Sequence, residues 1–282
     1  VDALSISTSG FNNNAGKVQS SGVLNVDAHS GALTNQQGLI SSAANADIKT
    51  GSLDNTGGQV LAAQTATVQA NLVQNDQGLI RANDLTVTAP TIHNTHSGDT
   101  GGIVGDTRLS VTANTQLDNQ AGYLAGGTTQ VHTADLSNQQ GQVIGTTDLA
   151  VDATQLNNST GTIAGNAHVS VSGQTLNNQS GIVSAQKDLT VSVGQINNTQ
   201  GTLLAKANQT VTADQLINSA GWVQGQQLTL AATSITNDNQ TINNALVKGT
   251  LLGNETLSIQ GNSLLNNSGA IQAGDDTHVG SA

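Results

Sequence analysis

The chain alternates apolar and polar residues in short segments that recur along its whole length. Segments such as Leu85-Thr-Val87, Leu149-Ala-Val151 and Leu189-Thr-Val191 place an aliphatic side chain at every second position. A period of two is typical of a strand with one buried face, because successive side chains of a strand point to opposite sides. No segment carries ten or more residues at the 3.6-residue spacing of a helix. The pattern therefore predicts short strands throughout.

An Asn that follows an apolar residue by two positions recurs at intervals close to twenty residues and defines thirteen units. The thirteen positions are Asn13, Asn35, Asn55, Asn75, Asn94, Asn119, Asn138, Asn158, Asn178, Asn198, Asn218, Asn237 and Asn266. Eleven units carry Gly three residues after the Asn, and an aliphatic residue commonly follows two positions later. Each column of this repeat holds one physical type of residue, which indicates that equivalent residues of successive units stack on one another.

Such a repeat predicts a β-solenoid in which each unit forms one coil of two or three short strands, paired in parallel with the coils on either side. We expect the Asn and Gly columns to form the corners, because both residues tolerate left-handed backbone and stacked Asn amides can hydrogen-bond along the axis. This corner ladder includes Asn138, Asn158, Asn178, Asn198, Gly141, Gly161, Gly181 and Gly201.

Thirteen coils at a strand spacing of about 4.8 Å would make a rod of roughly 60 Å. Both ends of the chain are repeat-like, and neither carries the polar cap of a self-sufficient solenoid. We therefore interpret residues 1–282 as a single shaft segment taken from a longer fibre.

Composition narrows the range of partners. The 282 residues include one Trp, one Tyr, one Phe, one Pro and no Cys, and only 9% are charged. The net charge of −11 offers no basic surface for nucleic acid or for an anionic membrane. No apolar run approaches the roughly 20 residues that span a bilayer, so we expect no membrane insertion by this segment.

Two units carry the clearest resemblance to a known family. Leu156-Asn-Asn158-Ser-Thr-Gly161-Thr-Ile163-Ala-Gly165 and Leu176-Asn-Asn178-Gln-Ser-Gly181 resemble the filamentous haemagglutinin repeat, and the likeness spans essentially the whole chain. The resemblance implies a right-handed parallel β-helix in the shaft of a large bacterial exoprotein of the two-partner secretion type. It also implies export through an outer-membrane transporter and an extracellular location on the bacterial cell surface.

The resemblance leaves two functions open. The first is a structural and adhesive shaft of a haemagglutinin-type adhesin that contributes to virulence. The second is the spacer shaft of a contact-dependent growth inhibition toxin, whose killing activity would lie further along the protein. The chain shows neither the secretion domain nor a toxin module of the family.

An enzyme is a remote third alternative, since parallel β-helices include polysaccharide lyases and hydrolases. Such sites need clustered carboxylates, whereas Asp84, Asp148 and Asp188 share one column in front of a strand and other residue types interrupt it. His93 and His96, with Asp99 beyond them, have a spacing compatible with a loop metal site but also with a polar surface loop. We predict no catalytic residue, no metal and no cofactor.

Two units depart from the regular spacing. The glycine arrives eight residues after Asn94, at Gly102, and twelve residues after Asn237, at Gly249. These insertions, at residues 95–101 and 238–248, fall between Asn and Gly. We expect them to protrude from the same corner, seven coils and roughly 34 Å apart.

The column after the glycine should point outward beside that corner, and it contains two of the three aromatic residues. Its members are Lys17, Leu39, Gln59, Leu79, Ile103, Tyr123, Gln142, Thr162, Ile182, Thr202, Trp222, Thr250 and Ala270. Exposed aromatics beside irregular loops suit recognition of a host or bacterial cell-surface receptor or glycan. The candidate binding residues are Tyr123, Trp222, His96, Asp99, Asp238 and Asn239. Alternatively, the aromatics only pack against the loops.

Overall fold

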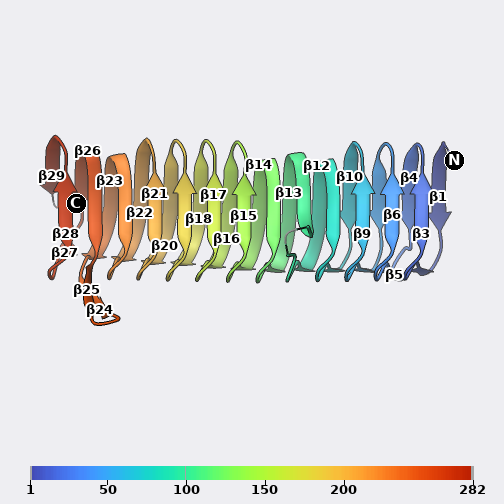
Figure 1. The fold of residues 1–282 in the computed structure, drawn as a ribbon, viewed down its shortest axis with the longest axis horizontal. Helices are drawn as coiled ribbons and strands as arrows, with labels where there is room; N and C mark the ends of the chain where they lie inside the picture. The colour runs from blue at the N-terminus through green and yellow to red at the C-terminus, as the bar shows by residue number, and fades with distance from the viewer. Residues whose placement is uncertain (1, 99, 281–282) are drawn as a thin grey trace. The chain divides into compact units, whose positions relative to one another are not determined.

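The computed structural model describes residues 2–98 and 100–280, whose short β-strands and turns wind into coils and pair in parallel apart from one hairpin. The chain divides into two compact units, residues 1–146 and 147–282, and each unit is a parallel β-solenoid with about 20 residues per turn (Figure 1). The structure thus confirms the β-solenoid that the repeat predicts. In the part of the chain that the structure describes, there is no helix long and apolar enough to span a bilayer.

Unit 1 begins with coils whose strands are short and ends with coils whose strands run almost unbroken around two corners. Each strand pairs in parallel with its counterpart one coil on, as Leu39–Ser42 does with Gln59–Ala62. Its strands are β1 Ala3–Ser7, β2 Phe11–Asn12, β3 Lys17–Ser20, β4 Val23–Asp27, β5 Ala32–Thr34, β6 Leu39–Ser42, β7 Ala46–Lys49, β8 Ser52–Asp54, β9 Gln59–Ala62, β10 Thr65–Gln69, β11 Leu72–Gln74, β12 Leu79–His93, β13 Gly102–Asp118, β14 Tyr123–Ser137 and β15 Gln142–Gly145.

Unit 2 repeats a short strand followed by a longer one, with Val169 paired to Leu189 and Leu176 paired to Ile196 in the next coil. Its parallel strands are β16 Leu149–Asn157, β17 Thr162–Gly165, β18 Val169–Asn177, β19 Ile182–Ala185, β20 Leu189–Asn197, β21 Thr202–Ala205, β22 Asn208–Ile217, β23 Trp222–Thr236, β26 Thr250–Gln260, β27 Ser263–Leu265, β28 Ala270–Ala273 and β29 Asp276–Gly280. The hairpin of β24 Asn239–Ile242 and β25 Ala245–Lys248 forms a separate antiparallel sheet.

The interior of each unit consists of aliphatic columns that run from coil to coil. In unit 1, Leu33, Leu53, Val73 and Ile92 occupy successive levels of one column and are fully buried. Leu and β-branched side chains suit these positions because they pack well on a pleated surface. Stacking identical faces in this way lets a chain with few aromatic residues bury a continuous core.

The Asn column forms a buried ladder at one corner of each unit. In unit 2 the Nδ2 of Asn158 donates to the Oδ1 of Asn178 at 2.7 Å, and Asn178 and Asn198 continue the series at 2.8 and 2.7 Å. In unit 1 the Nδ2 of Asn119 donates to Asn138 Oδ1 at 2.7 Å. A buried amide is stable only when its donors and acceptor are paired, and each rung pairs with the next.

The prediction that the Asn and Gly columns adopt left-handed backbone is wrong. Positive φ angles fall instead on the residue between them, directly before the glycine, such as Gln140, Thr160, Ser180 and Gln200 at 55–57°. Glycine is required at this position because a side chain would have no room. A Cβ at Gly181 would lie 2.1 Å from the carbonyl oxygen of Asn158 and 2.6 Å from Asn178 Oδ1, and Gly141, Gly161 and Gly201 hold the equivalent position in their coils.

Candidate functional site

The inserted loop of unit 1 is shorter than the sequence indicates. Thr95 and His96 keep regular corner positions, since Thr95 O accepts from Gln77 N and His96 has the usual positive φ of 49°. Gly101 is the true corner glycine, because Gly102 N donates to Gly78 O as the residue after the glycine does in other coils. The insertion is therefore residues 97–100.

The shifted register also corrects the outward column at this coil. Gly102 pairs with Leu79 and takes the outward position, whereas Ile103 pairs with Ile80 and is fully buried. Gly102 has a φ of 111°, and a Cβ there would lie 2.3 Å from Tyr123 O. A glycine is needed at this point because the next coil approaches so closely.

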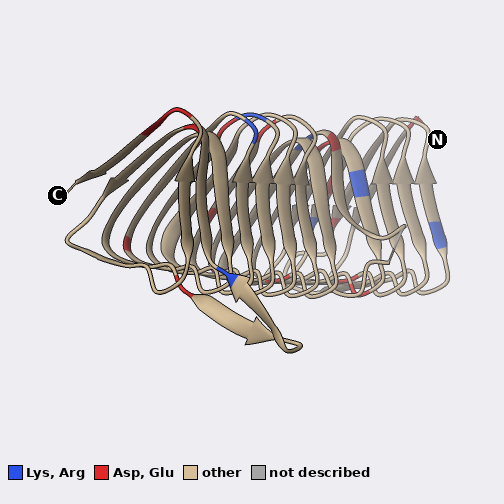
Figure 2. Ribbon diagram, turned by 60° about the vertical axis from the view of Figure 1, so that its left-hand side comes forward, with Lys and Arg blue, Asp and Glu red and all other residues tan. Residues whose placement is uncertain are grey.

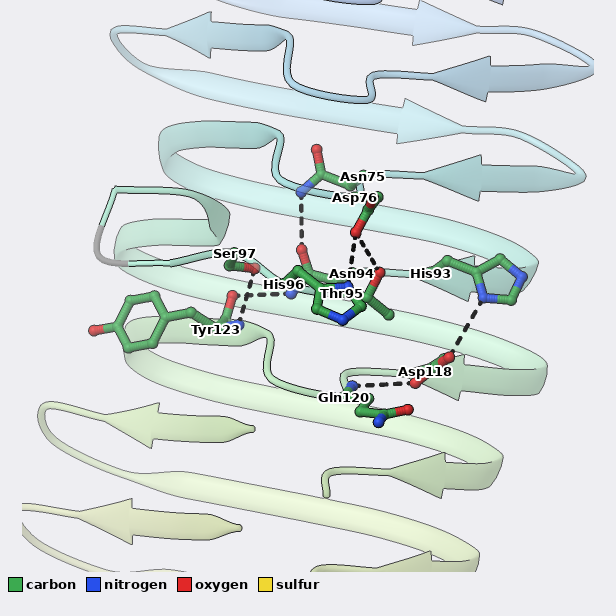
Figure 3. Close-up of polar contacts among 10 residues, drawn as sticks. All are labelled: Asn75, Asp76, His93, Asn94, Thr95, His96, Ser97, Asp118, Gln120 and Tyr123. Atoms are coloured by element: carbon green, nitrogen blue, oxygen red, sulfur yellow. Dashed lines mark hydrogen bonds and ion pairs between the residues drawn. The ribbon is translucent and has the colours of Figure 1, made fainter. Parts of the chain in front are cut away.

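Tyr123 lies in the coil that follows the loop-bearing coil, and it is half-buried. Its backbone N–H donates to the Oγ of Ser97 at 3.2 Å, and its carbonyl accepts from Asn94 Nδ2 at 3.0 Å (Figure 3). Ser97 itself is buried. The loop is thus tied to the coil that bears Tyr123, while the phenol ring extends away from the loop contacts drawn in Figure 3.

The two histidines near the loop contact different carboxylates. His96 Nδ1 lies 3.0 Å from Asp76 Oδ1, which also accepts from Thr95 Oγ1 at 2.8 Å. His93 Nδ1 lies 3.8 Å from Asp118 Oδ2, well away from His96 (Figure 3). Asp99 lies outside the described residues. Within residues 2–98 and 100–280, no three His, Asp or Glu side chains are grouped as metal ligands would be.

The insertion of unit 2 forms the hairpin β24–β25, which projects from the coils (Figure 2). Its strands pair from Asn239 with Lys248 to Ile242 with Ala245. Asn243 and Asn244 form the turn with φ angles of 49° and 63°, the left-handed pair that a tight hairpin turn requires. Leu246 and Val247 remain exposed on the hairpin, at 57% and 36%.

Asp238 and Asn239 lie at the base of the hairpin. Asp238 keeps the regular position after the ladder Asn, since its carbonyl accepts from Ala220 N at 3.0 Å. Its Oδ1 is buried without a hydrogen-bond partner among the described residues. Asn239 Nδ2 donates to Asn267 O at 3.5 Å. Asp238 therefore belongs to the coil that carries the hairpin, and Asn239, the first residue of the hairpin, contacts the next coil.

Trp222 is 41% exposed on the outer face of unit 2. Its indole Nε1 donates to Gln224 Oε1 at 2.7 Å, and Gln224 Nε2 donates to Asn254 Oδ1 at 3.0 Å. Thr250, its partner in the next coil, is only 6% exposed. The indole is thus oriented by its polar edge, and its apolar surface remains accessible.

Sequence reasoning missed two bulges in β13. Asp106 and Thr107 lie opposite the single residue Asn83, and residues 114–115 lie opposite Pro90. Arg81 Nε donates to Asp106 Oδ1 at 2.9 Å and fixes the first bulge in place. The signal in the sequence is the long interval between Asn94 and Asn119, which the loop and the two bulges share.

The acidic column before the strands is engaged in contacts between coils. Asp188 Oδ1 accepts from the backbone and side-chain nitrogens of Asn208 at 3.0 and 2.9 Å, and His168 Nδ1 lies 3.0 Å from Asp188 Oδ2. The backbone hydrogen bond from Asn208 is the main cause that lowers the pKa of Asp188 below its ordinary value. Asp148 similarly accepts from His168 N at 3.2 Å. These carboxylates act as turn acceptors.

Comparison with known families gives a match over the whole chain. The sequence model of the haemagglutinin repeat matches residues 2–121, 102–173, 162–247 and 241–282. Searches of curated proteins and of solved structures returned no match.

Proposed function

Since this chain belongs to the haemagglutinin repeat family, we propose that it is a structural and adhesive shaft segment of a large bacterial surface fibre. The fibre is exported by two-partner secretion through an outer-membrane transporter and works outside the cell. Residues 1–282 form part of its shaft, and the outward aromatics mediate attachment to a receptor or glycan on a host or bacterial cell.

Uninterrupted stacking in each unit supports the shaft role. The ladder passes through both irregular coils without a break, since Asn94 bonds Asn119 at 2.8 Å and Asn237 bonds Asn266 at 2.7 Å. Each coil therefore adds a fixed increment of length regardless of what its corner carries. A fibre built in this way holds its surface features at a set distance from the cell.

The observation that carries the attachment role is the exposed indole of Trp222 on a unit that also bears the projecting hairpin. Trp combines a large apolar surface with a polar edge and is enriched at recognition surfaces. Tyr123 provides a second aromatic on unit 1, next to the loop at residues 97–100. We treat these as two separate contact points, one in each unit.

The test is adherence of beads coated with the purified chain to epithelial cells and to bacterial cells. We expect Trp222→Ser and Tyr123→Ser each to lower the number of bound beads several-fold. Ile182→Ser is the matched control, because Ile182 occupies the same outward column in a regular coil and is 43% exposed. It should leave adherence unchanged.

Unchanged adherence of the Trp222→Ser, Tyr123→Ser double variant would refute the attachment role. It would favour the alternative, a spacer shaft of a contact-dependent growth inhibition toxin. A toxin encoded after this segment, with an immunity gene beside it, would identify that alternative. Export is tested separately by surface labelling of the fibre in cells that lack the partner transporter, where we expect the label to disappear.

A further inference from the structure

Unit 1 carries an open groove of about 720 Å³ across β3, β6, β9 and the start of β12, hereafter the corner groove. Ligand sites in proteins typically measure about 300–1,000 Å³. Four strands at a spacing of roughly 4.8 Å give the corner groove a length of roughly 14 Å along the stack. Its lining residues include neither Tyr123 nor a residue of the loop at 97–100, although Leu79 pairs with Gly102 just after that loop. A site here would therefore be an addition to the aromatic contact points proposed above.

The corner groove lies where one corner position is alanine in two successive coils of unit 1. Ala43 and Ala63 follow β6 and β9, and each donates its backbone N–H to the preceding coil, to Ser20 O and Ser42 O respectively. In unit 2 the same backbone bond is made by Gln186 and Lys206, which carry long side chains at this corner position. Replacing long residues with alanine at successive levels leaves a continuous recess.

The first bulge of β13 lies at one end of the corner groove. Asp106 lines the groove and is held by Arg81 at 2.9 Å, and Thr107 Oγ1 donates to Asn83 Oδ1 at 2.7 Å. Both members of the ion pair are about half exposed, so they can also contact a ligand. The bond to Asp106 uses one of the five N–H donors of a guanidinium.

The remaining lining combines aliphatic side chains with neutral polar ones. Leu61 and Leu79 are half-buried and present aliphatic surface. Gln19 Nε2 donates to Ser41 Oγ at 3.3 Å, which leaves the amide oxygen and the hydroxyl proton to bond a ligand. Among the described residues that line the corner groove, the charged ones are Arg81 and Asp106, and their charges offset each other.

These features select among ligand classes. β6 and β9 are paired on both sides by neighbouring coils, so an extended peptide cannot add to them as a strand. An anionic ligand is disfavoured because Arg81, the cation that lines the groove, is already paired with Asp106. The net charge of −11 on the chain adds repulsion. A neutral chain with many hydroxyl groups and apolar ring faces fits the amide, the hydroxyl, the ion pair and the aliphatic floor together.

We propose that the corner groove binds the end of a neutral oligosaccharide, which lies along the stack with its terminal sugar against Arg81 and Asp106. Leu61 and Leu79 contact the sugar faces, and Gln19 and Ser41 bond hydroxyl groups along the chain. The terminal sugar is placed at Arg81 and Asp106 because the lining of the groove ends at this ion pair.

The test is titration calorimetry on the full 282-residue chain with cellotetraose, maltotetraose, chitotetraose and lacto-N-tetraose as neutral probes and tetragalacturonate as the anionic one. We expect at least one neutral probe to bind at micromolar to millimolar concentration and tetragalacturonate to bind more weakly than that probe. No binding by any of the four neutral probes would overturn the proposal, as would tighter binding of tetragalacturonate.

Two variants locate the binding. Ala63→Gln places in the groove the side chain that unit 2 carries at Gln186, and Arg81→Gln removes the ion pair. Each should weaken binding at least about tenfold, since Ala63→Gln occupies the space of the ligand and Arg81→Gln removes polar contacts to it. Gln186→Ala is the matched control and should bind like the parent chain. Circular dichroism checks that Ala63→Gln, a change at an exposed residue, retains the β spectrum.

An unchanged affinity of Ala63→Gln would place the sugar elsewhere and overturn the proposal. So would dimerisation of the parent chain, seen by sedimentation, that Ala63→Gln abolishes, because the groove would then hold a second copy of the chain. Neither result depends on Tyr123 or Trp222, so failure here and failure of the attachment role are distinguishable.

Discussion

The regular corner at Asn178 and the expanded corner at Asn237 solve the same structural problem with very different lengths of chain. At the first, two residues separate Asn178 from Gly181, while at the second the whole hairpin lies between Asn237 and Gly249. Yet Asn178 and Asn237 each bond the ladder in both directions at 2.7–2.9 Å. The glycine that follows packs against the carbonyl of the preceding ladder Asn in both cases.

The difference shows that the solenoid depends on its Asn and Gly contacts and not on the segment between them. Asp238 even retains the backbone bond that Gln179 makes in the regular corner, from Ala220 N in one case and Thr160 N in the other. A recognition feature can therefore be added between Asn and Gly at little structural cost. Three changes, taken from the largest expected effect to the smallest, test this separation.

Breaking the ladder should have the largest effect. Asn178→Ala removes three bonds from Nδ2, to Asn198 Oδ1, Gly181 O and Thr202 O, and takes from Asn158 Nδ2 the shortest of its three hydrogen bonds. Each buried polar group left unpaired costs about 1–3 kcal/mol, so we expect the free energy of unfolding to fall by about 3–5 kcal/mol. Urea denaturation followed by circular dichroism measures this change.

The control for the ladder is Asn166→Ala, at an exposed position of the same unit. It should change the free energy of unfolding by less than about 0.5 kcal/mol. Hydrogen exchange should locate the Asn178→Ala effect in the coils on either side of it. Equal losses in the two variants would mean that the ladder is no more important than the surface.

Filling the corner glycine should have an intermediate effect. A Cβ at Gly141 would lie 2.1 Å from Asn119 O and 2.6 Å from Asn138 Oδ1, so Gly141→Ala must push two coils apart locally. We expect a loss of about 1–3 kcal/mol in the free energy of unfolding, as for other overpacked sites.

Gly10→Ala is the comparison for this change, because the nearest atom to its Cβ would be 3.6 Å away. Thermal and urea unfolding of the two variants should differ clearly, with Gly10→Ala close to the parent chain. If Gly141→Ala were as stable as Gly10→Ala, the requirement for glycine would not be steric.

The aligned repeats predicted the fold well because each equivalent position occupies the same structural environment in successive coils. The apolar residue two before the Asn is buried in successive coils, as Leu156, Leu176 and Ile196 show. The columns failed where one coil departs from the rest. Gln209 takes a buried position between Leu189 and Leu228, although its own sequence neighbourhood looks like an ordinary turn before a strand.

The surface was harder to predict than the core for the same reason. A single long interval between Asn94 and Asn119 gave no means of dividing its extra residues between the loop and the bulges of β13. Placing Gly102 at the corner therefore put Ile103 outside, whereas it is fully buried. The hairpin likewise forms by strand pairing within the insertion. No other coil carries an equivalent segment, so comparison of the coils could not predict this pairing.

Removing the hairpin should have the smallest effect on stability. Replacing residues 238–248 with the Gln-Ser pair of the regular corner restores the spacing of Asn178 to Gly181. Because Asn237 and Gly249 keep their contacts, we expect the free energy of unfolding to change by less than about 1 kcal/mol, which is the scale of loop-length effects. The reciprocal graft, which puts residues 238–248 in place of Gln179 and Ser180, should be tolerated equally. Urea denaturation of the two grafts decides the matter: a loss of several kcal/mol in either would show that the hairpin and its coil stabilise each other, and that the corner is not an independent platform.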